Sequence, residues 1–131
     1  MDRKARTQRL VTLMAERLAD NKMEMAGKID SVFRFKIGSS CIRLVDVRES
    51  DRVAVRNDEP GVKVDATLEM SDDDFALICA GKLKPEHAFM VRRLAVKGNL
   101  LRAMRLNSLF ELMRKVTSQT LPSTGSPAAR L

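Results

Sequence analysis

The spacing of the hydrophobic residues changes from a helical to a strand pattern near residue 30 of the 131-residue chain, and this change constrains the fold more than any other feature. Within residues 3–26, Leu10, Val11, Met14 and Leu18 recur at intervals of one, three and four positions. Side chains at these intervals share one face of a helix, so the sequence predicts an amphipathic helix over 3–26. From residue 31 onward, hydrophobic and polar residues alternate, as in a strand with one buried face.

This alternation predicts four consecutive strands, over residues 31–37, 41–47, 52–56 and 62–70. The segments between them are rich in Gly, Ser, Asn, Asp and Pro, which favour turns and loops. Because strands joined by short turns pair with their neighbours in opposite directions, we expect an antiparallel sheet.

Three aspartates, Asp72, Asp73 and Asp74, follow the last of these strands. Ser71 is predicted to cap a helix there, and carboxylates in a first turn are stabilised by the positive end of the helix dipole. Three adjacent carboxylates also fit a metal or acid–base site, but the helix start accounts for them without one. Gly81 is predicted to end this helix.

The rest of the chain is predicted to contain short elements. These are a helix over 85–90, a fifth strand over 92–97, and a helix over 99–106 within the very apolar segment 99–115. This order of helices and strands predicts a single α+β domain over residues 1–115. Residues 116–131 are rich in Ser, Thr, Pro and Gly, and we expect them to form a flexible C-terminal tail.

The charges are unevenly distributed around a net charge of +7. Residues 1–28 carry +3, residues 29–81 carry −4 and residues 82–131 carry +8. A basic balance of this kind favours nucleic acid or anionic membrane as partners. The chain has no apolar run long enough to span a membrane and no visible signal peptide.

The residues that carry chemistry are few, and we expect no catalytic residue, no metal site and no cofactor. Cys41 and Cys79 lack metal-ligand spacing and are interpreted as buried reduced thiols. His87 is interpreted as a surface helix residue. An acyl-CoA thioesterase is the enzyme alternative, but the chain has no Gly-x-Ser-x-Gly motif, and Asp46 is a lone candidate carboxylate without a partner.

Several segments, in order, resemble the sterol carrier protein (non-specific lipid-transfer protein) family. The matching segments are LVDV at 44–47 and the region 62–106, and the resemblance covers residues 6–115. The residues that carry it are Ser71 to Phe75, then Gly81, Lys82, Leu83, Pro85, Ala88 and Phe89, then Leu94, Val96, Gly98 and Asn99, then Ala103 to Leu106. The chain departs from the family pattern at Arg92, where a Gly is common, and at Arg43, where an aromatic residue is common.

The resemblance implies a five-stranded, mainly antiparallel sheet covered by about five helices, with an apolar tunnel between sheet and helices. It also implies an intracellular carrier that binds fatty acids, fatty acyl-CoA, sterols or phospholipids and transfers or presents them without catalysing a reaction. The helix over 99–113 is expected to be the mobile wall of the tunnel. The residues expected to line it are Phe33, Phe35, Phe75, Ile78, Phe89, Met90, Leu101, Met104, Phe110 and Met113.

The last three residues, Ala129, Arg130 and Leu131, resemble the Ser-Lys-Leu peroxisomal address. In a eukaryotic protein with this natural C-terminus, the pattern predicts binding to the peroxisomal import receptor and residence in the peroxisome. Otherwise we expect the protein to be cytoplasmic.

Two other functions fit parts of the sequence. The basic first helix and the basic C-terminal third favour transient contact with anionic membranes, and the alternative to a carrier is a basic membrane-surface or enzyme-docking module without its own ligand. Nucleic acid is not expected as a partner, because the chain has no aromatic stacking platform and no zinc-ligand spacing.

Overall fold

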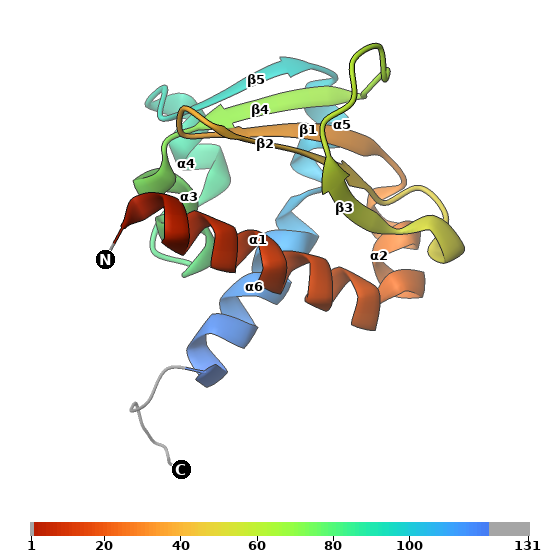
Figure 1. Cartoon of the computed structure of the whole chain (residues 1–131), viewed down its shortest axis with the longest axis horizontal. Helices are drawn as coiled ribbons and strands as arrows, with labels where there is room; N and C mark the ends of the chain where they lie inside the picture. The colour runs from red at the N-terminus through yellow and green to blue at the C-terminus, as the bar shows by residue number, and fades with distance from the viewer. Residues whose placement is uncertain (1, 121–131) are drawn as a thin grey trace.

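The computed structural model describes residues 2–120, and it places six α-helices on one side of a five-stranded sheet within that range (Figure 1). The helices are α1 (Arg3–Asp20), α2 (Lys22–Ile29), α3 (Asp72–Cys79), α4 (Pro85–Met90), α5 (Leu100–Met104) and α6 (Asn107–Thr120). The strands are β1 (Val32–Ile37), β2 (Cys41–Asp46), β3 (Ala54–Asn57), β4 (Ala66–Met70) and β5 (Leu94–Gly98), and a short 3-10 helix, η1 (Ser50–Arg52), precedes β3. The predicted α+β class is confirmed.

The sheet has the strand order β3-β2-β1-β4-β5. Three of its four strand pairs are antiparallel, as expected, but β1 and β4 run parallel. The mainly antiparallel sheet is confirmed, and only the antiparallel pairing expected among the first four strands fails at this pair, because the chain passes from the β3 edge over to the far side of β1 before it forms β4. Asp65 fixes this crossing: its backbone N–H donates to the Val32 carbonyl (2.7 Å), and its carboxylate accepts from the Val32 N–H (2.8 Å).

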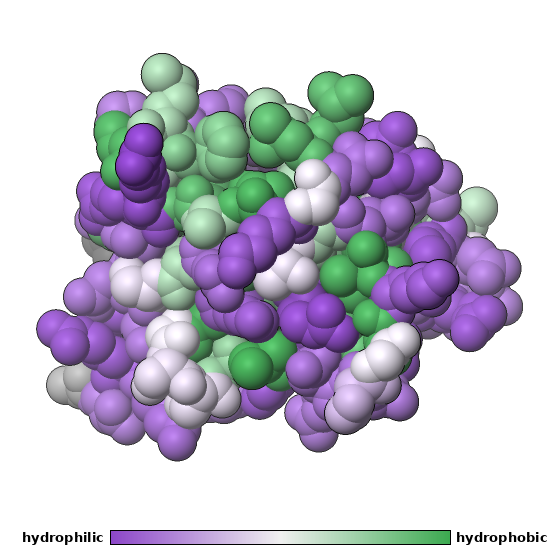
Figure 2. All heavy atoms as spheres, turned by 90° about the horizontal axis from the view of Figure 1, so that it is seen from above, coloured by the Kyte–Doolittle hydropathy of each residue, from purple (hydrophilic) through white to green (hydrophobic). Residues whose placement is uncertain are grey.

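The two faces of the sheet differ in polarity, as the alternation predicts. Phe33, Phe35 and Ile37 of β1 are buried on the face that the helices cover, beside Leu68 and Met70 of β4. On the other face, Lys36 pairs with Glu69 across the two strands. Figure 2 shows this second face from above: hydrophilic residues cover much of it, and hydrophobic residues gather toward its upper edge. The core therefore lies between the sheet and the helices.

The predicted helix over 3–26 is two helices, α1 and α2, that meet at Asn21. The Asn21 side chain donates to the Arg17 carbonyl (2.8 Å), which competes with the helical hydrogen bond that this carbonyl would otherwise accept. The predicted apolar stripe is confirmed, because Val11, Met14 and Leu18 are all buried.

Two other predicted boundaries differ from the structure. Residues 62–65 form a loop ahead of β4, and Arg34 holds this region against the outer face of the sheet by donating to Asp58 (2.8 Å) and to the Val62 carbonyl (3.2 Å). Helix α6 continues to Thr120, so the segment 116–131, predicted as a flexible tail, begins with helical residues, and its residues 121–131 lie outside the described part of the chain.

Helices α3 and α4 end in the same hydrogen-bonding motif with different residues. After α3, the N–H of Gly81 donates to Ile78 and that of Lys82 to Leu77; after α4, the N–H of Arg92 donates to Phe89 and that of Arg93 to Ala88. This pattern is a Schellman motif, whose first residue beyond the cap adopts a left-handed conformation that suits Gly. Gly81 has φ 78°, but the equivalent residue after α4 is Arg92, with φ 65°.

Replacing Arg92 with Gly is therefore expected to raise the free energy of unfolding by about 1 kcal/mol, because it removes the Cβ that disfavours this conformation. The change is measured by urea unfolding. The matched control, His87→Gly, lies inside α4 and is expected to lower the free energy of unfolding by about 1 kcal/mol. Destabilisation of similar size in both variants would contradict this explanation of the motif.

Candidate functional site

The ten predicted tunnel residues separate into two groups by exposure. Six are buried in the core: Phe33, Phe35, Phe75, Ile78, Phe110 and Met113. Four are at the surface: Phe89, Met90, Leu101 and Met104. The structure therefore does not place all ten around one cavity.

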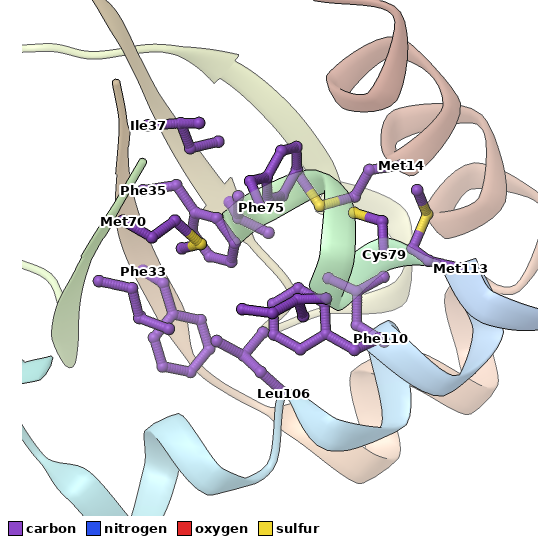
Figure 3. Close-up of a cluster of buried hydrophobic side chains, with 14 of the residues drawn as sticks. Met14, Phe33, Phe35, Ile37, Met70, Phe75, Cys79, Leu106, Phe110 and Met113 are labelled. Carbon is purple, nitrogen blue, oxygen red and sulfur yellow. The ribbon is translucent and has the colours of Figure 1, made fainter. Parts of the chain in front are cut away.

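The buried group forms a close-packed core (Figure 3). The rings of Phe35 on β1 and Phe110 on α6 lie 6.2 Å apart between centroids and are tilted by 47°. Figure 3 shows Met14, Met70 and Met113 among the aromatic side chains of this cluster. Met side chains adapt to irregular spaces, so a core of this composition tolerates rearrangement around a guest better than one of β-branched residues.

A small apolar hollow lies beside this core, between β4, β5 and helices α4, α5 and α6. We call it the apolar opening, and its lining is Leu68, Pro85, Phe89, Leu94, Val96, Leu100, Ala103, Met104, Asn107 and Phe110. Asn107 is its one polar residue, so water gains few hydrogen bonds inside. Phe110 belongs both to the opening and to the aromatic pair of the core.

The apolar opening has a volume of only about 20 Å³. Pockets that hold small-molecule ligands have volumes of about 300–1,000 Å³. At this place the described residues enclose no apolar space of ligand size, because the side chains of α5 and α6 pack against the sheet, and the apolar tunnel that the family resemblance implies stays a prediction.

A second, wider hollow adjoins the apolar opening and has a volume of about 270 Å³. It lies between α4 and α6, and it shares Pro85, Asn107 and Phe110 with the opening. Ile78 also lines it, together with charged residues such as Lys84 and Arg114. Phe110 therefore stands at the boundary between an apolar space and a polar one.

Helix α5 is held over the opening mainly by polar contacts. Its cap residue, Asn99, accepts a hydrogen bond from the N–H of Arg102 (3.0 Å). The Arg102 guanidinium donates to the Asp30 carbonyl (2.8 Å) at the end of α2. Ala103 is the one buried residue of α5. A short helix with little buried surface opens at low free-energy cost. The predicted mobile wall over 99–113 also includes the first half of α6, where Leu109, Phe110 and Met113 are buried, so the mobility of the whole segment stays a prediction.

The two departures from the family pattern lie at different places. Arg92 is exposed at the end of α4, next to the residues of the opening. Arg43 lies on β2, where its guanidinium donates to the Gln8 side chain of α1 (3.2 Å). Of the two, only Arg92 is placed to affect a ligand at the apolar opening.

Sequence reasoning did not select several residues of the opening: Leu68, Pro85, Leu94, Val96, Leu100, Ala103 and Asn107. Leu94 and Val96 were recognised as one face of a strand, but the sequence alone does not show that β5 is an edge strand. The sequence clue that Leu94 and Val96 line the opening was that they lie only a few residues from two short helices rich in hydrophobic residues.

The three aspartates of α3 have structural roles. The Ser71 hydroxyl accepts a hydrogen bond from the Asp74 N–H (3.0 Å), which confirms the predicted cap. Asp72 accepts from the Thr7 hydroxyl, Asp73 pairs with Arg6 (2.6 Å), and Asp74 accepts from Arg93 (2.9 Å). Within residues 2–120, no group of three or more His, Cys, Asp or Glu residues is arranged to hold a metal ion.

Asp46 has a partner that the sequence did not reveal. Its buried carboxylate accepts two hydrogen bonds from the Arg48 guanidinium (2.9 and 2.7 Å), and Arg56 lies 3.5 Å away. The hydrogen bonds from Arg48 lower the pKa of Asp46 below its usual value, against the opposing effect of burial. Asp46 is thus an ionised structural group, unsuited to act as a general acid.

The thiols and the histidine lie where the sequence predicted. Cys41 and Cys79 are both free and buried, and burial raises the pKa of Cys79 to about 12. A thiol with so high a pKa is a poor nucleophile at neutral pH. His87 is exposed on α4.

The chain matches the SCP-2 sterol transfer family over residues 11–111. It is 35% identical over 100 residues to non-specific lipid-transfer protein-like 1 of Caenorhabditis elegans, which covers 73% of this chain and 82% of that protein. It is 31% identical over 93 residues to hydroxysteroid dehydrogenase-like protein 2 of Danio rerio, where the match covers 70% of this chain but spans only 22% of that protein.

Solved structures show the same fold. Sterol carrier protein 2 from Yarrowia lipolytica, in its apo form, superposes with a TM-score of 0.65 at 22% identity and covers 79% of this chain and 88% of that one. Sterol carrier protein 2 from Aedes aegypti, in complex with the C16 fatty acid palmitate, gives a TM-score of 0.52 at 18% identity and covers 72% and 94%.

Two remaining features concern membranes and targeting. In the part of the chain that the structure describes, no helix is both long and apolar enough to cross a membrane. Ala129, Arg130 and Leu131 lie outside the described residues, so the peroxisomal address and its import receptor stay predictions.

Replacing Asp46 with Asn is expected to lower the free energy of unfolding by about 1–2 kcal/mol at pH 7, since the charge-assisted bonds are lost and Arg48 is half-exposed. Because the pKa of Asp46 is lowered in the folded state, its contribution is present above the unfolded value near 3.9 and is lost as the pH falls through the folded value. The deficit of the variant should therefore shrink below about pH 4.

Urea unfolding from pH 7 to pH 3 measures this pH dependence. Asp51→Asn, which removes an exposed carboxylate from η1, is the control and should change the free energy of unfolding little at any pH. A deficit for the Asp46 variant that stays constant down to pH 3 would contradict the assigned ion pair.

Proposed function

This chain belongs to the SCP-2 sterol transfer family, and on that premise we propose that it binds a lipid through the apolar opening and carries it in solution. The ligand classes are those with a large hydrocarbon part: fatty acids, fatty acyl-CoA, sterols and phospholipids. The observation that carries the proposal is the lining of the opening, in which nine of ten residues are hydrophobic or Pro and which leads to Phe110 in the core.

The hydrophobic effect supplies the affinity. Each CH₂ group taken out of water contributes about 0.8 kcal/mol, so a long acyl chain gains enough free energy without directed hydrogen bonds. A lining that makes few directed hydrogen bonds discriminates poorly between chains of similar width. This argument supports binding of several lipid classes.

Uptake requires the opening to widen. Displacing α5 breaks the bonds from Arg102 to Asp30 and Ser31 but exposes only one buried side chain of that helix, Ala103. Phe110 must also move from its contact with Phe35 if the ligand is to enter the core. The hydrocarbon part then lies between β4, β5 and α6, while a carboxylate or phosphate head stays at the surface, where Lys84 and Arg92 are exposed at the two ends of α4.

We propose carriage without catalysis. The dehydrogenase-like relative is matched over only 22% of its length, so its activity is not carried over. In this chain, Asp46, Asp73 and Asp74 are bound by arginines, and the buried Cys79 thiol has a raised pKa. These groups support the fold and leave the ligand chemically unchanged when it is transferred or presented to a partner.

The proposal is tested by titrating the protein with a fluorescent fatty acid and with palmitoyl-CoA, alongside native mass spectrometry for co-purified lipid. A double variant, Leu100→Gln with Met104→Gln, places two amides in the opening and is expected to weaken binding on the order of tenfold, because apolar contacts to the ligand are lost.

Met23→Gln is the matched control. Met23 is 81% exposed on α2, away from the opening, so its replacement should leave the affinity unchanged. A folded wild-type protein that contains no lipid and binds neither probe would contradict the proposed function.

A further inference from the structure

We propose that the protein docks on an anionic membrane surface through an exposed apolar patch around the edge strand β5. This docking patch consists of Phe89, Met90 and Val91 at the end of α4 and of Leu100, Leu101 and Met104 on α5. The proposal rests on the proposed function, because it places the apolar opening against the membrane from which a lipid would be taken.

The exposure of these side chains is unusual for a protein surface. Met90 is 77% exposed and Leu101 is 80% exposed. Single exposed hydrophobic residues are common, but a contiguous group marks an interaction site. Six of the seven large hydrophobic side chains that are exposed in the described chain belong to the docking patch, and the seventh is Met23. Three of the six, Phe89, Leu100 and Met104, line the opening itself.

The charge around the patch matches an anionic surface. Residues 82–105, which include the whole patch, contain seven basic residues and one acidic residue. Arg92 directly follows the patch residue Val91 and is exposed, while Lys97, on β5 between the two parts of the patch in sequence, is exposed and forms a long ion pair of 3.9 Å with Glu69. Hydrophobic side chains that insert below the headgroups, with cations at headgroup level, are the combination that binds anionic bilayers.

Helix α1 is a weaker candidate for membrane contact, although it is the most amphipathic basic segment at the N-terminus. Its hydrophobic stripe is buried, since Val11, Met14 and Leu18 pack in the core. Its cations are also partly neutralised: Arg6 pairs with Asp73 and Arg17 with Asp20. Membrane contact through α1 would require this helix to leave the protein.

A second copy of the chain is the competing occupant, because β5 is an edge strand with unpaired backbone groups. Pairing two β5 strands would bring two copies of the same basic surface together, and like charges oppose such contact. An anionic bilayer can contact both the hydrophobic side chains and the basic residues of this surface, so we infer that the patch binds a membrane.

A single tryptophan reports the contact directly, because the chain contains no Trp and no Tyr. Leu101→Trp places the reporter in the docking patch, and Met23→Trp places it at an equally exposed site on α2. Vesicles of phosphatidylcholine with phosphatidylserine should shift the emission of the first variant to shorter wavelength and allow its quenching by lipids brominated in the acyl chain. The second variant should show neither change.

Co-flotation with the same vesicles measures the energetics. Met90→Gln with Leu101→Gln should lower the bound fraction on the order of tenfold, and Arg92→Asn, which keeps a residue suited to the left-handed conformation, about fivefold. Met23→Gln and Lys4→Gln, which lie on α2 and α1, are the matched controls and should bind as the wild type does. Vesicles of phosphatidylcholine alone should bind the wild type more weakly.

The outcomes separate this inference from the proposed function. Binding of the fluorescent fatty acid in vesicle-free buffer, without vesicle binding, would overturn the docking site and leave the carrier function standing. Vesicle binding through the patch, without fatty-acid binding, would support the docking site and contradict the carrier. Equal Trp responses at positions 23 and 101, or a dimer in sedimentation that the Met90 and Leu101 changes dissociate, would also overturn the membrane proposal.

Discussion

The contact between Phe35 of β1 and Phe110 of α6 is the interaction on which the rest of the structure depends. Phe35 lies in the central strand, and its ring is part of the buried face that the parallel pairing of β1 and β4 creates. Phe110 covers that face and at the same time lines the apolar opening. One side chain thus belongs both to the core and to the opening, so a ligand taken up along the proposed path would compete with core packing for the same volume.

The part of the fold that a ligand on the proposed path would disturb is the β5 edge of the sheet. Here the covering helices are short, α5 has one buried residue, and hydrophobic side chains remain exposed. Toward the opposite edge, Val11, Met14 and Leu18 of the α1 stripe are buried and Leu10 is partly buried. Because fewer side chains are buried at the β5 edge than along α1, local opening is expected to cost less free energy there, which agrees with the proposed path for a ligand.

Much of the fold could be predicted from the sequence, because the side chains that a helix or strand buries recur at regular intervals along the chain. The alternation in β1, the stripe of α1 and the Ser71 cap all match the structure, and the family resemblance is confirmed by the match over residues 11–111. Other features depend on contacts between residues far apart in the chain. The parallel pairing of β1 with β4 depends on Asp65 meeting Val32, and the separation of Phe89 and Met104 from Phe33 and Phe35 depends on β5 being an edge strand. The break at Asn21 could have been suspected, since Asn disfavours a helix interior.

Chemical-shift mapping by NMR during a titration with palmitate tests the central claim most directly. If the apolar opening admits the ligand, the largest changes should fall on β5, α5 and the start of α6, including Phe110, with small changes on β3 and the first turns of α1. Changes of similar size throughout, or the largest changes around Asp2, Ser39 and Cys41, where a separate polar hollow lies, would contradict it.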